Sequence, residues 1–305
     1  MKYFLPVNHR LENFFLWKVD GANAIRVGVP NAESHPSSHL VLAKGETFKR
    51  ALTRTFSGQR FFEVPFKVYE VKRAPGEFYP RIARPSSNYP LDGPGSCPDT
   101  KSFAHSLASS LVQMRALSAK LAAIFQIVHP SAENANCFGH EIRNLMLLAC
   151  TEVESQMKGI MLANGYSRAR FTMNDYIKLQ NAMKLDQYAA SFPGYPWWPS
   201  VRPFEKWRAS TSPTKDLPWY AAYNAVKHDR EAEFHNAKLQ HAADALCACI
   251  ILLVAQFGKS LTLGFEGELG SFIRIDAVPK WDASEVYIGP LDNKTASLKA
   301  VSFAF

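Results

Sequence analysis

The stretch Trp219-Tyr-Ala-Ala-Tyr223-Asn224-Ala-Val-Lys227-His228-Asp229-Arg230-Glu-Ala-Glu-Phe-His235 gathers aromatic, amide, cationic and imidazole side chains at helical spacing. It directly precedes the most apolar segment of the chain. Residues three and four apart lie on one face of an α-helix, so a continuous helix would stack Asn224, His228 and His235 on one side. A break near Asp229 would place His235 on a separate element. We therefore expect the fold to be organised around this helical stretch.

Two kinds of chemistry suit these residue types. Histidine titrates near neutral pH, so an imidazole beside an amide or a carboxylate is fitted for general acid–base catalysis. Lysine and arginine side chains hold phosphates. The candidate catalytic residues are His228, Arg230, His235 and Asn224, and the candidate substrate-binding residues are Tyr223, Lys227, Glu152 and Trp219. The alternative interpretation is a plain helix end, whose polar side chains satisfy backbone groups or face water.

The segment from Pro199 to Gly258 resembles the HEPN family of nucleotide-binding helical bundles. The residues that carry the resemblance are Arg202-Pro203-Phe204, Trp207, Trp219, Tyr223 to Arg230, Phe234, Ala237, Leu239 and the long apolar segment after them. The resemblance implies an antiparallel helical bundle that forms a homodimer through its motif-bearing helices. It also implies a protein directed at RNA or nucleotides, in a host-defence or toxin–antitoxin role.

The ribonuclease motif of that family has an Arg, then a polar residue that is often Asn, and a His a few residues later. It fits this chain in two registers. In the first, Asn224 and His228 match the polar residue and the His, while Tyr223 stands at the Arg position. In the second, Arg230 and His235 match the Arg and the His, while a glutamate follows the Arg.

The resemblance implies a metal-independent endoribonuclease that needs no cofactor. In it His228 or His235 acts as the acid–base, and Lys227 or Arg230 binds the scissile phosphate. The alternative is a non-catalytic bundle that binds a nucleotide, RNA or a protein partner. The departure from the motif in each register favours this alternative.

The composition indicates what kind of partner the chain takes. It has 35 Lys and Arg against 27 Asp and Glu, a net charge of +8 and a pI of about 9.2. This balance favours polyanions such as RNA, DNA or nucleotide phosphates. The five cysteines form no Cys-x-x-Cys pair, which predicts free thiols in a reducing, cytoplasmic setting. No Cys and His cluster has ligand spacing, so no metal site is predicted.

The apolar stretch over residues 242–257 is the candidate membrane span. It has 16 residues and contains Asp244 and Gln256, whereas a spanning helix needs roughly 20 apolar residues. We therefore predict a buried core helix and no membrane partner.

The first two parts of the chain differ in pattern. Residues 1–98 are rich in strand-forming residues, with strands predicted over 14–19, 24–29, 39–42 and 61–71, a short helix over 45–55 and a Pro-rich linker over 74–98. The resemblance implies that residues 99–260 form the HEPN-like bundle, and the apolar spacing predicts helices over 100–128, 139–164 and 172–192 before the stretch quoted first. Glu152 lies at the edge of an apolar face, and we expect it to pair with His228, Arg230 or a Trp N–H.

The last part, residues 261–305, returns to strand character over 261–265, 272–278, 285–289 and 298–303. Strands this short rarely form an independent core. We therefore predict that they share one sheet with the N-terminal strands. The expected fold class is α+β, with a central antiparallel helical bundle and strand-rich segments at both ends.

Overall fold

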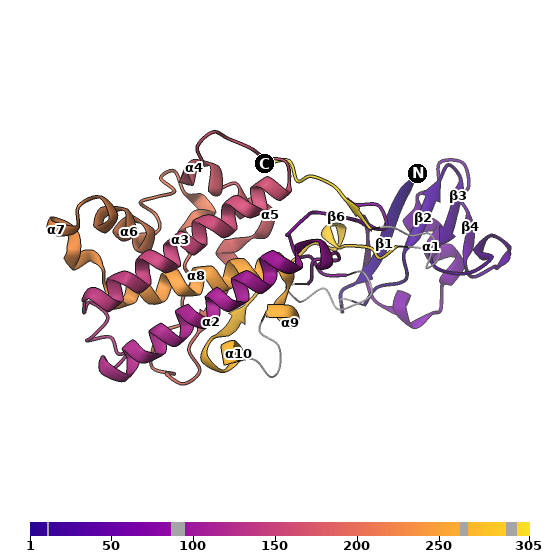
Figure 1. Cartoon of the computed structure of the whole chain (residues 1–305). Helices are drawn as coiled ribbons and strands as arrows, with labels where there is room; N and C mark the ends of the chain where they lie inside the picture. Colours follow the sequence, from indigo (N-terminus) through magenta and orange to yellow (C-terminus); the bar gives the residue numbers. More distant parts are fainter. Residues whose placement is uncertain (11, 87–94, 263–267, 291–297) are drawn as a thin grey trace. The chain divides into compact units, whose positions relative to one another are not determined.

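The computed structural model describes residues 1–10, 12–86, 95–262, 268–290 and 298–305, and the chain forms two compact units. The sheet unit consists of Met1–Phe78, Arg84–Gly93 and Lys280–Ala300, and the helical unit of Tyr79–Ala83, Pro94–Pro279 and Val301–Phe305. One unit is built on strands and the other on long helices (Figure 1). The predicted α+β class is confirmed.

A five-stranded antiparallel sheet, in the order β4-β3-β2-β1-β5, forms the framework of the sheet unit. Its strands are β1 (Lys2–Asn8), β2 (Trp17–Asp20), β3 (Asn23–Arg26), β4 (His39–Val41) and β5 (Phe66–Glu70). The single-turn helices η1 (Ala32–Ser34) and η2 (Arg60–Glu63) lie in its connections. One face packs on helix α1 (Phe48–Phe56) through an aromatic cluster centred on Trp17, which has no exposed surface.

Strand β1 lies between β2 and β5, although the sequence pattern predicts no strand there. Pro6 obscures the pattern because proline cannot donate to a strand ladder. Residues on either side of Pro6 make hydrogen bonds to the β5 side: the Val71 N–H donates to the Tyr3 carbonyl at 2.9 Å and the His9 N–H to the Pro65 carbonyl at 3.1 Å. Because such bonds fall on every second residue of an antiparallel strand, Tyr3 and His9 bond to the β5 side and Pro6 does not. Pro6 therefore sits where no N–H toward β5 is needed.

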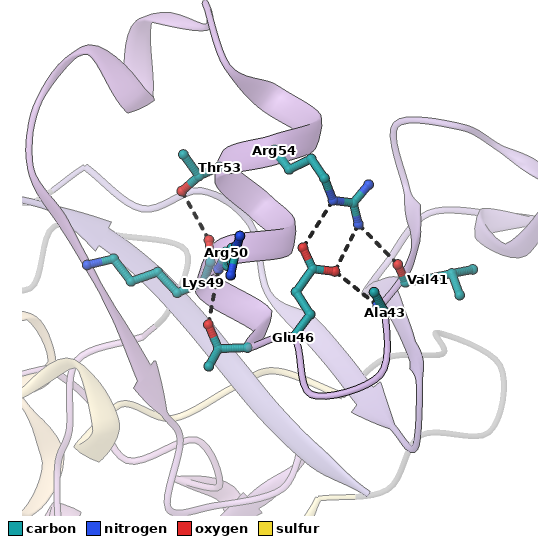
Figure 2. Close-up of polar contacts among 8 residues, drawn as sticks. Val41, Ala43, Glu46, Lys49, Arg50, Thr53 and Arg54 are labelled. Atoms are coloured by element: carbon teal, nitrogen blue, oxygen red, sulfur yellow. Dashed lines mark hydrogen bonds and ion pairs between the residues drawn. The ribbon is translucent and has the colours of Figure 1, made fainter.

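Helix α1 confirms the helix predicted over residues 45–55. Its N-terminus is capped by Thr47, whose hydroxyl accepts the Arg50 N–H at 3.3 Å. Arg54 donates two hydrogen bonds of 3.0 Å to the Glu46 carboxylate and one of 3.2 Å to the Val41 carbonyl (Figure 2). The bonds from Arg54 hold the pKa of Glu46 down at about 2. Arg54 is thus engaged within its own unit.

Three long helices, α2 (Ala104–Ile127), α3 (His140–Ala163) and α8 (Leu239–Phe257), pack side by side in the helical unit (Figure 1). The first two confirm the helices predicted over 100–128 and 139–164. Helix α8 is the one described helix that is long and apolar enough to cross a membrane, and 83% of that stretch is buried. The prediction of a buried core helix is confirmed.

A chain of buried polar side chains links α3 and α8. The Arg81 Nε donates to Gln256 at 2.8 Å, Gln256 donates to Gln156 at 3.1 Å, and Gln156 donates to Glu152 at 2.9 Å. Arg81 and both glutamines are almost completely buried. Each buried polar group therefore has a partner, which keeps the cost of its desolvation low. Glu152 belongs to this chain.

The remaining helical elements are short. The predicted helix over 172–192 is instead divided into α4 (Met173–Tyr176), α5 (Leu179–Met183), the single turn η4 (Leu185–Gln187) and strand β7 (Ala189–Ser191). Thr172 and Asp175 form a capping box at its start, as expected of a helix N-terminus. Lys184 has a φ of 51°, and this left-handed conformation ends the helical run.

The C-terminal strands do not join the N-terminal sheet, so the prediction of one shared sheet is wrong. Strand β8 (Arg274–Ala277) pairs antiparallel with β7 in the helical unit, and β9 (Lys299–Ala300) pairs in parallel with β6 (Glu77–Phe78) in the sheet unit. The ribbon of β7 and β8 buries Ala189, Ala190 and Ile275. The pairing of β8 with β7 is therefore stabilised by burial in the helical unit. The sequence of β8 alone does not reveal this partner.

The other predicted C-terminal strands take different forms. Residues 259–262 form helix α9 (Lys259–Thr262), and most of the strand predicted over 261–265 lies outside the described residues. Helix α10 (Glu268–Phe272) precedes β8, and the single turn η7 (Ala283–Glu285) packs beside β1 and β5 in the sheet unit.

The chain packs closely around Gly258, the residue at which α8 ends. Its φ is 93° and its ψ is 159°, and an added Cβ would lie 2.3 Å from the Gly95 carbonyl oxygen. We expect Gly258→Ala to lower the free energy of unfolding by about 3 kcal/mol or more, because both the conformation and the contact exclude a side chain. Gly194→Ala, where nothing lies within 4 Å, should change it by less than about 0.5 kcal/mol. Equal urea midpoints for the two variants would contradict this expectation.

Candidate functional site

The predicted motif stretch folds as three consecutive elements. Helix α6 (Pro218–His228) has proline in its first turn, where no N–H is needed. It ends at Asp229, whose carboxylate accepts the Ala232 N–H at 3.0 Å and so caps helix α7 (Arg230–Glu233). The single turn η6 (Phe234–Asn236) follows. The helix is therefore broken at Asp229, which is one of the two arrangements that the sequence allows.

Trp219 anchors the first turn of α6 in the core. Its indole N–H donates to the Pro203 carbonyl at 2.9 Å, and its ring meets Phe204 edge-on at 6.0 Å. It is 1% exposed. The predicted substrate-binding residue thus serves to fix α6 against the loop that carries Arg202-Pro203-Phe204.

Of the two tyrosines that follow Trp219 on α6, Tyr220 joins α6 to α3 and Tyr223 contacts Lys227 on α6 itself. The Tyr220 hydroxyl lies 2.5 Å from a Glu154 carboxylate oxygen, and burial together with this bond raises the pKa of Tyr220. The Lys227 ammonium donates to the Tyr223 hydroxyl at 3.0 Å, and this bond raises the pKa of Lys227. Tyr223 is 2% exposed. Its ring therefore packs in the core while its hydroxyl positions an exposed lysine.

The C-terminal end of α6 presents the other candidates to solvent. His228, Arg230 and His235 are exposed, and Asn224 is half-buried. The His235 Nδ1 lies 3.2 Å from the Ala232 carbonyl oxygen. Among the described residues, the Asn224, His228 and Arg230 side chains have no hydrogen bond or ion pair with the protein. These three side chains are therefore available to a ligand.

The break at Asp229 separates the two registers of the motif. Asn224 and His228 lie four residues apart on one helix, so they share a face. Arg230 lies on α7 and His235 on η6. Only the first register is therefore held on a single rigid element.

Glu152 does not accompany these residues, because its carboxylate bonds to Gln156 in the buried polar chain. Burial raises the pKa of Glu152. Glu154, which the sequence analysis missed, is the carboxylate that α6 contacts. Positions two apart on a helix point to different faces, so the two glutamates reach different partners. The available signal was that Glu154 follows the buried Cys150 by four residues, which places it beside the packed face of α3.

A small aromatic cluster beside η6 was also missed. The ring of Phe234 meets Phe138 edge-on at 5.8 Å and lies 4.9 Å from the His140 ring. Phe138 is 52% exposed. The starts of α3 and α8 and the helix α7 lie at the same end of the helical unit (Figure 1). An uncovered ring there is a surface on which a base could stack.

A cavity of about 230 Å³ lies under the loop 199–206 and reaches α6 at Pro218 and Trp219. Asp244, on the first turns of α8, lines it together with Arg202 and Lys206. Gln240 donates to the Asp244 carboxylate at 2.7 Å. Burial raises the pKa of Asp244 to about 7, so this carboxyl group titrates near neutral pH.

No three His, Cys, Asp or Glu side chains among the described residues gather closely enough to hold a metal ion. All five cysteines are free thiols, and burial raises the pKa of Cys150, Cys247 and Cys249.

Comparison of the chain with protein families, curated proteins and solved structures finds no match. The resemblance to the HEPN family therefore rests on the residues quoted above.

Because the pKa of Asp244 is raised, the free energy of unfolding should depend on pH. The folded chain holds this proton more tightly than the unfolded chain, so the stabilisation is complete below about pH 4 and is lost as the pH rises through about 7. Asp244→Asn cannot ionise. We expect its free energy of unfolding, relative to the wild type, to rise by about 2–3 kcal/mol between about pH 5 and pH 8. Urea unfolding at both pH values measures this, and a difference that does not change with pH would contradict it.

Proposed function

We propose that this protein is directed at RNA through the C-terminal end of α6, and that His228 cleaves RNA there without a metal ion. The observation that carries the proposal is the set of ligand-accessible side chains around His228, on a helix that is otherwise fixed in the core. Lys227 and Arg230 bring positive charge to the same end, and Asn224 brings an amide on the same face as His228. These are the groups that a phosphodiester requires.

The first register of the motif is the one that we propose is active. In it a tyrosine stands where the family has its arginine. Tyr223 directs the ammonium of Lys227 by a 3.0 Å hydrogen bond, so Lys227 can supply the positive charge that the arginine would supply. Lysine gives a point charge and not a bidentate fork, so the phosphate would be held less rigidly.

The proposed reaction uses the 2′-hydroxyl group of RNA. Neutral His228 accepts the 2′-hydroxyl proton while the 2′-oxygen bonds to the adjacent phosphorus and the bond to the 5′-oxygen breaks. The 5′-oxygen leaves with a proton from solvent, and the other product ends in a 2′,3′-cyclic phosphate. Lys227 and Arg230 stabilise the extra negative charge on the phosphate oxygens in the transition state.

The second candidate function is RNA or nucleotide binding without cleavage. Two observations favour it: Tyr223 is buried in place of the arginine, and no described protein group bonds to His228 to orient its ring. A second copy of the chain, as the resemblance implies, could provide the missing partner across the α6 ends. Five free thiols are compatible with the cytoplasm, where we place the protein.

Cleavage of a mixed-sequence RNA, with divalent metals chelated, tests the proposal. We expect the wild type to cleave and His228→Ala to lose at least about a hundredfold in rate, because the acid–base group is removed. His235→Ala should keep most of the activity, since η6 lies outside the first register. His105→Ala, an exposed histidine on α2, is the matched control.

The outcomes separate the two candidate functions. Loss of cleavage in His235→Ala alone would overturn the choice of register. RNA binding by the wild type without cleavage would replace the proposal with the binding module. A wild type that neither binds nor cleaves RNA would contradict both candidate functions.

A further inference from the structure

A cavity lies in the sheet unit, where the end of β1 meets the start of β5. Its volume is about 660 Å³, which is in the range of small-ligand sites. The His9 N–H and the Pro65 carbonyl, joined at 3.1 Å, form the end of the strand ladder at its edge. Residues 280–283, which are distant in sequence, complete the wall. With Lys49 of α1, the cavity is therefore built from four separate segments of one compact unit.

Aromatic rings form much of the cavity wall. They belong to Trp281 and to Phe66 and Tyr69, which lie on opposite faces of the edge strand β5. The Phe66 ring is held by edge-to-face contact with Phe62 at 4.9 Å, and the Arg84 guanidinium lies 3.8 Å from the Trp281 ring centre. Rings held by such contacts lose little freedom when a flat ligand stacks against them.

Positive charge surrounds this aromatic wall. Lys49, Lys67 and Lys280 line the cavity, and Asp282 is its one acidic lining residue. The Lys49 ammonium lies 5.1 Å from the centre of the Phe66 ring. Lys67 is exposed and makes no described hydrogen bond or ion pair with the protein.

Two cationic side chains of helix α1, Arg54 and Lys49, have different surroundings. Arg54 is bound to Glu46, while Lys49 extends from the other side of the helix (Figure 2). Lys49 makes no ion pair with the described residues, so it brings an unneutralised positive charge to the cavity. The sheet unit as a whole carries five of the eight net positive charges of the chain, although it is the smaller of the two units.

From this combination we infer that the cavity binds a nucleotide unit, with the base against the Tyr69 ring and the phosphate on Lys67, two residues earlier on the same face of β5. An aromatic ring with a lysine beside it fits a molecule that is aromatic at one end and anionic at the other. Aromatic side chains in a basic groove are how proteins hold single strands without sequence preference. The nucleotide can be free or part of a strand, and the experiment below distinguishes these sources. The inference does not depend on cleavage at α6.

Fluorescence anisotropy with a labelled single-stranded DNA of about 12 nucleotides, in chelator at low salt, tests the contribution of Lys67. We expect Lys67→Ala to weaken binding about three- to tenfold and to reduce the slope of log K against log salt by about 0.7, because one phosphate contact is lost. Lys44→Ala removes the same charge from an exposed position outside the cavity, and it should change binding by less than about twofold.

The ring is tested by Tyr69→Leu, which keeps an apolar side chain but removes the stacking surface. We expect it to weaken binding about fivefold or more, in line with the contribution of one stacked base. Thermal unfolding of each variant checks that the sheet unit stays folded. Competition by uridine or adenosine monophosphate identifies the source: displacement at millimolar level indicates a free nucleotide, and its absence indicates a strand.

Two results would overturn the inference. One is equal weakening by Lys67→Ala and Lys44→Ala, which would indicate diffuse attraction to the charge of the unit. The other is the absence of binding by both the strand and the monophosphates at low salt. The DNA strand lacks the 2′-hydroxyl group that the proposed cleavage at α6 needs, so failure of that cleavage and failure of this inference are distinguishable.

Discussion

The burial of α8 on all sides is the constraint on which the helical unit depends. An isolated helix with this composition would expose a continuous apolar surface, so other segments must cover every face. Helices α2, α3 and α6 and strand β7 all pack against it. The polar residues of α8 must then find partners within the protein. Gln256 bonds to Arg81 and Gln156, and Asp244 bonds to Gln240 beside a cavity.

The position of α6 follows from the same constraint. One side of α6 is committed to the core through Trp219, Tyr220 and Tyr223, and its last turn is the part that reaches solvent. A functional group on this helix can therefore act on a ligand only near its C-terminal end. This geometry explains why the side chains best placed for chemistry lie at and just beyond the last turn.

The sequence predicts the elements that have a strong local pattern. It does not predict the elements whose structure depends on packing against a distant segment. Helices α2 and α3 follow from apolar spacing and from Pro130 and Gly165, which mark their ends. The pairing of β8 with β7 depends on a surface built by distant segments, so no pattern within residues 272–278 reveals it. Of the candidate site, the chemistry-bearing residues at the end of α6 were identifiable, whereas Glu154 and Phe138 become relevant only when α6 and η6 are placed beside them.

The division of the sheet unit into separate chain segments has a consequence for how the protein is made. The cluster beside β1 and β5 includes Ala283, Val286 and Ile288, which follow the whole helical unit in the sequence. Chains emerge from the ribosome from the N-terminus at about 5–20 residues per second. The N-terminal strands must therefore wait, with one apolar face uncovered, for roughly ten seconds or more while the helical unit is synthesised. Translation speed across residues 94–279 thus sets how long the unfinished sheet is exposed to aggregation or to chaperones.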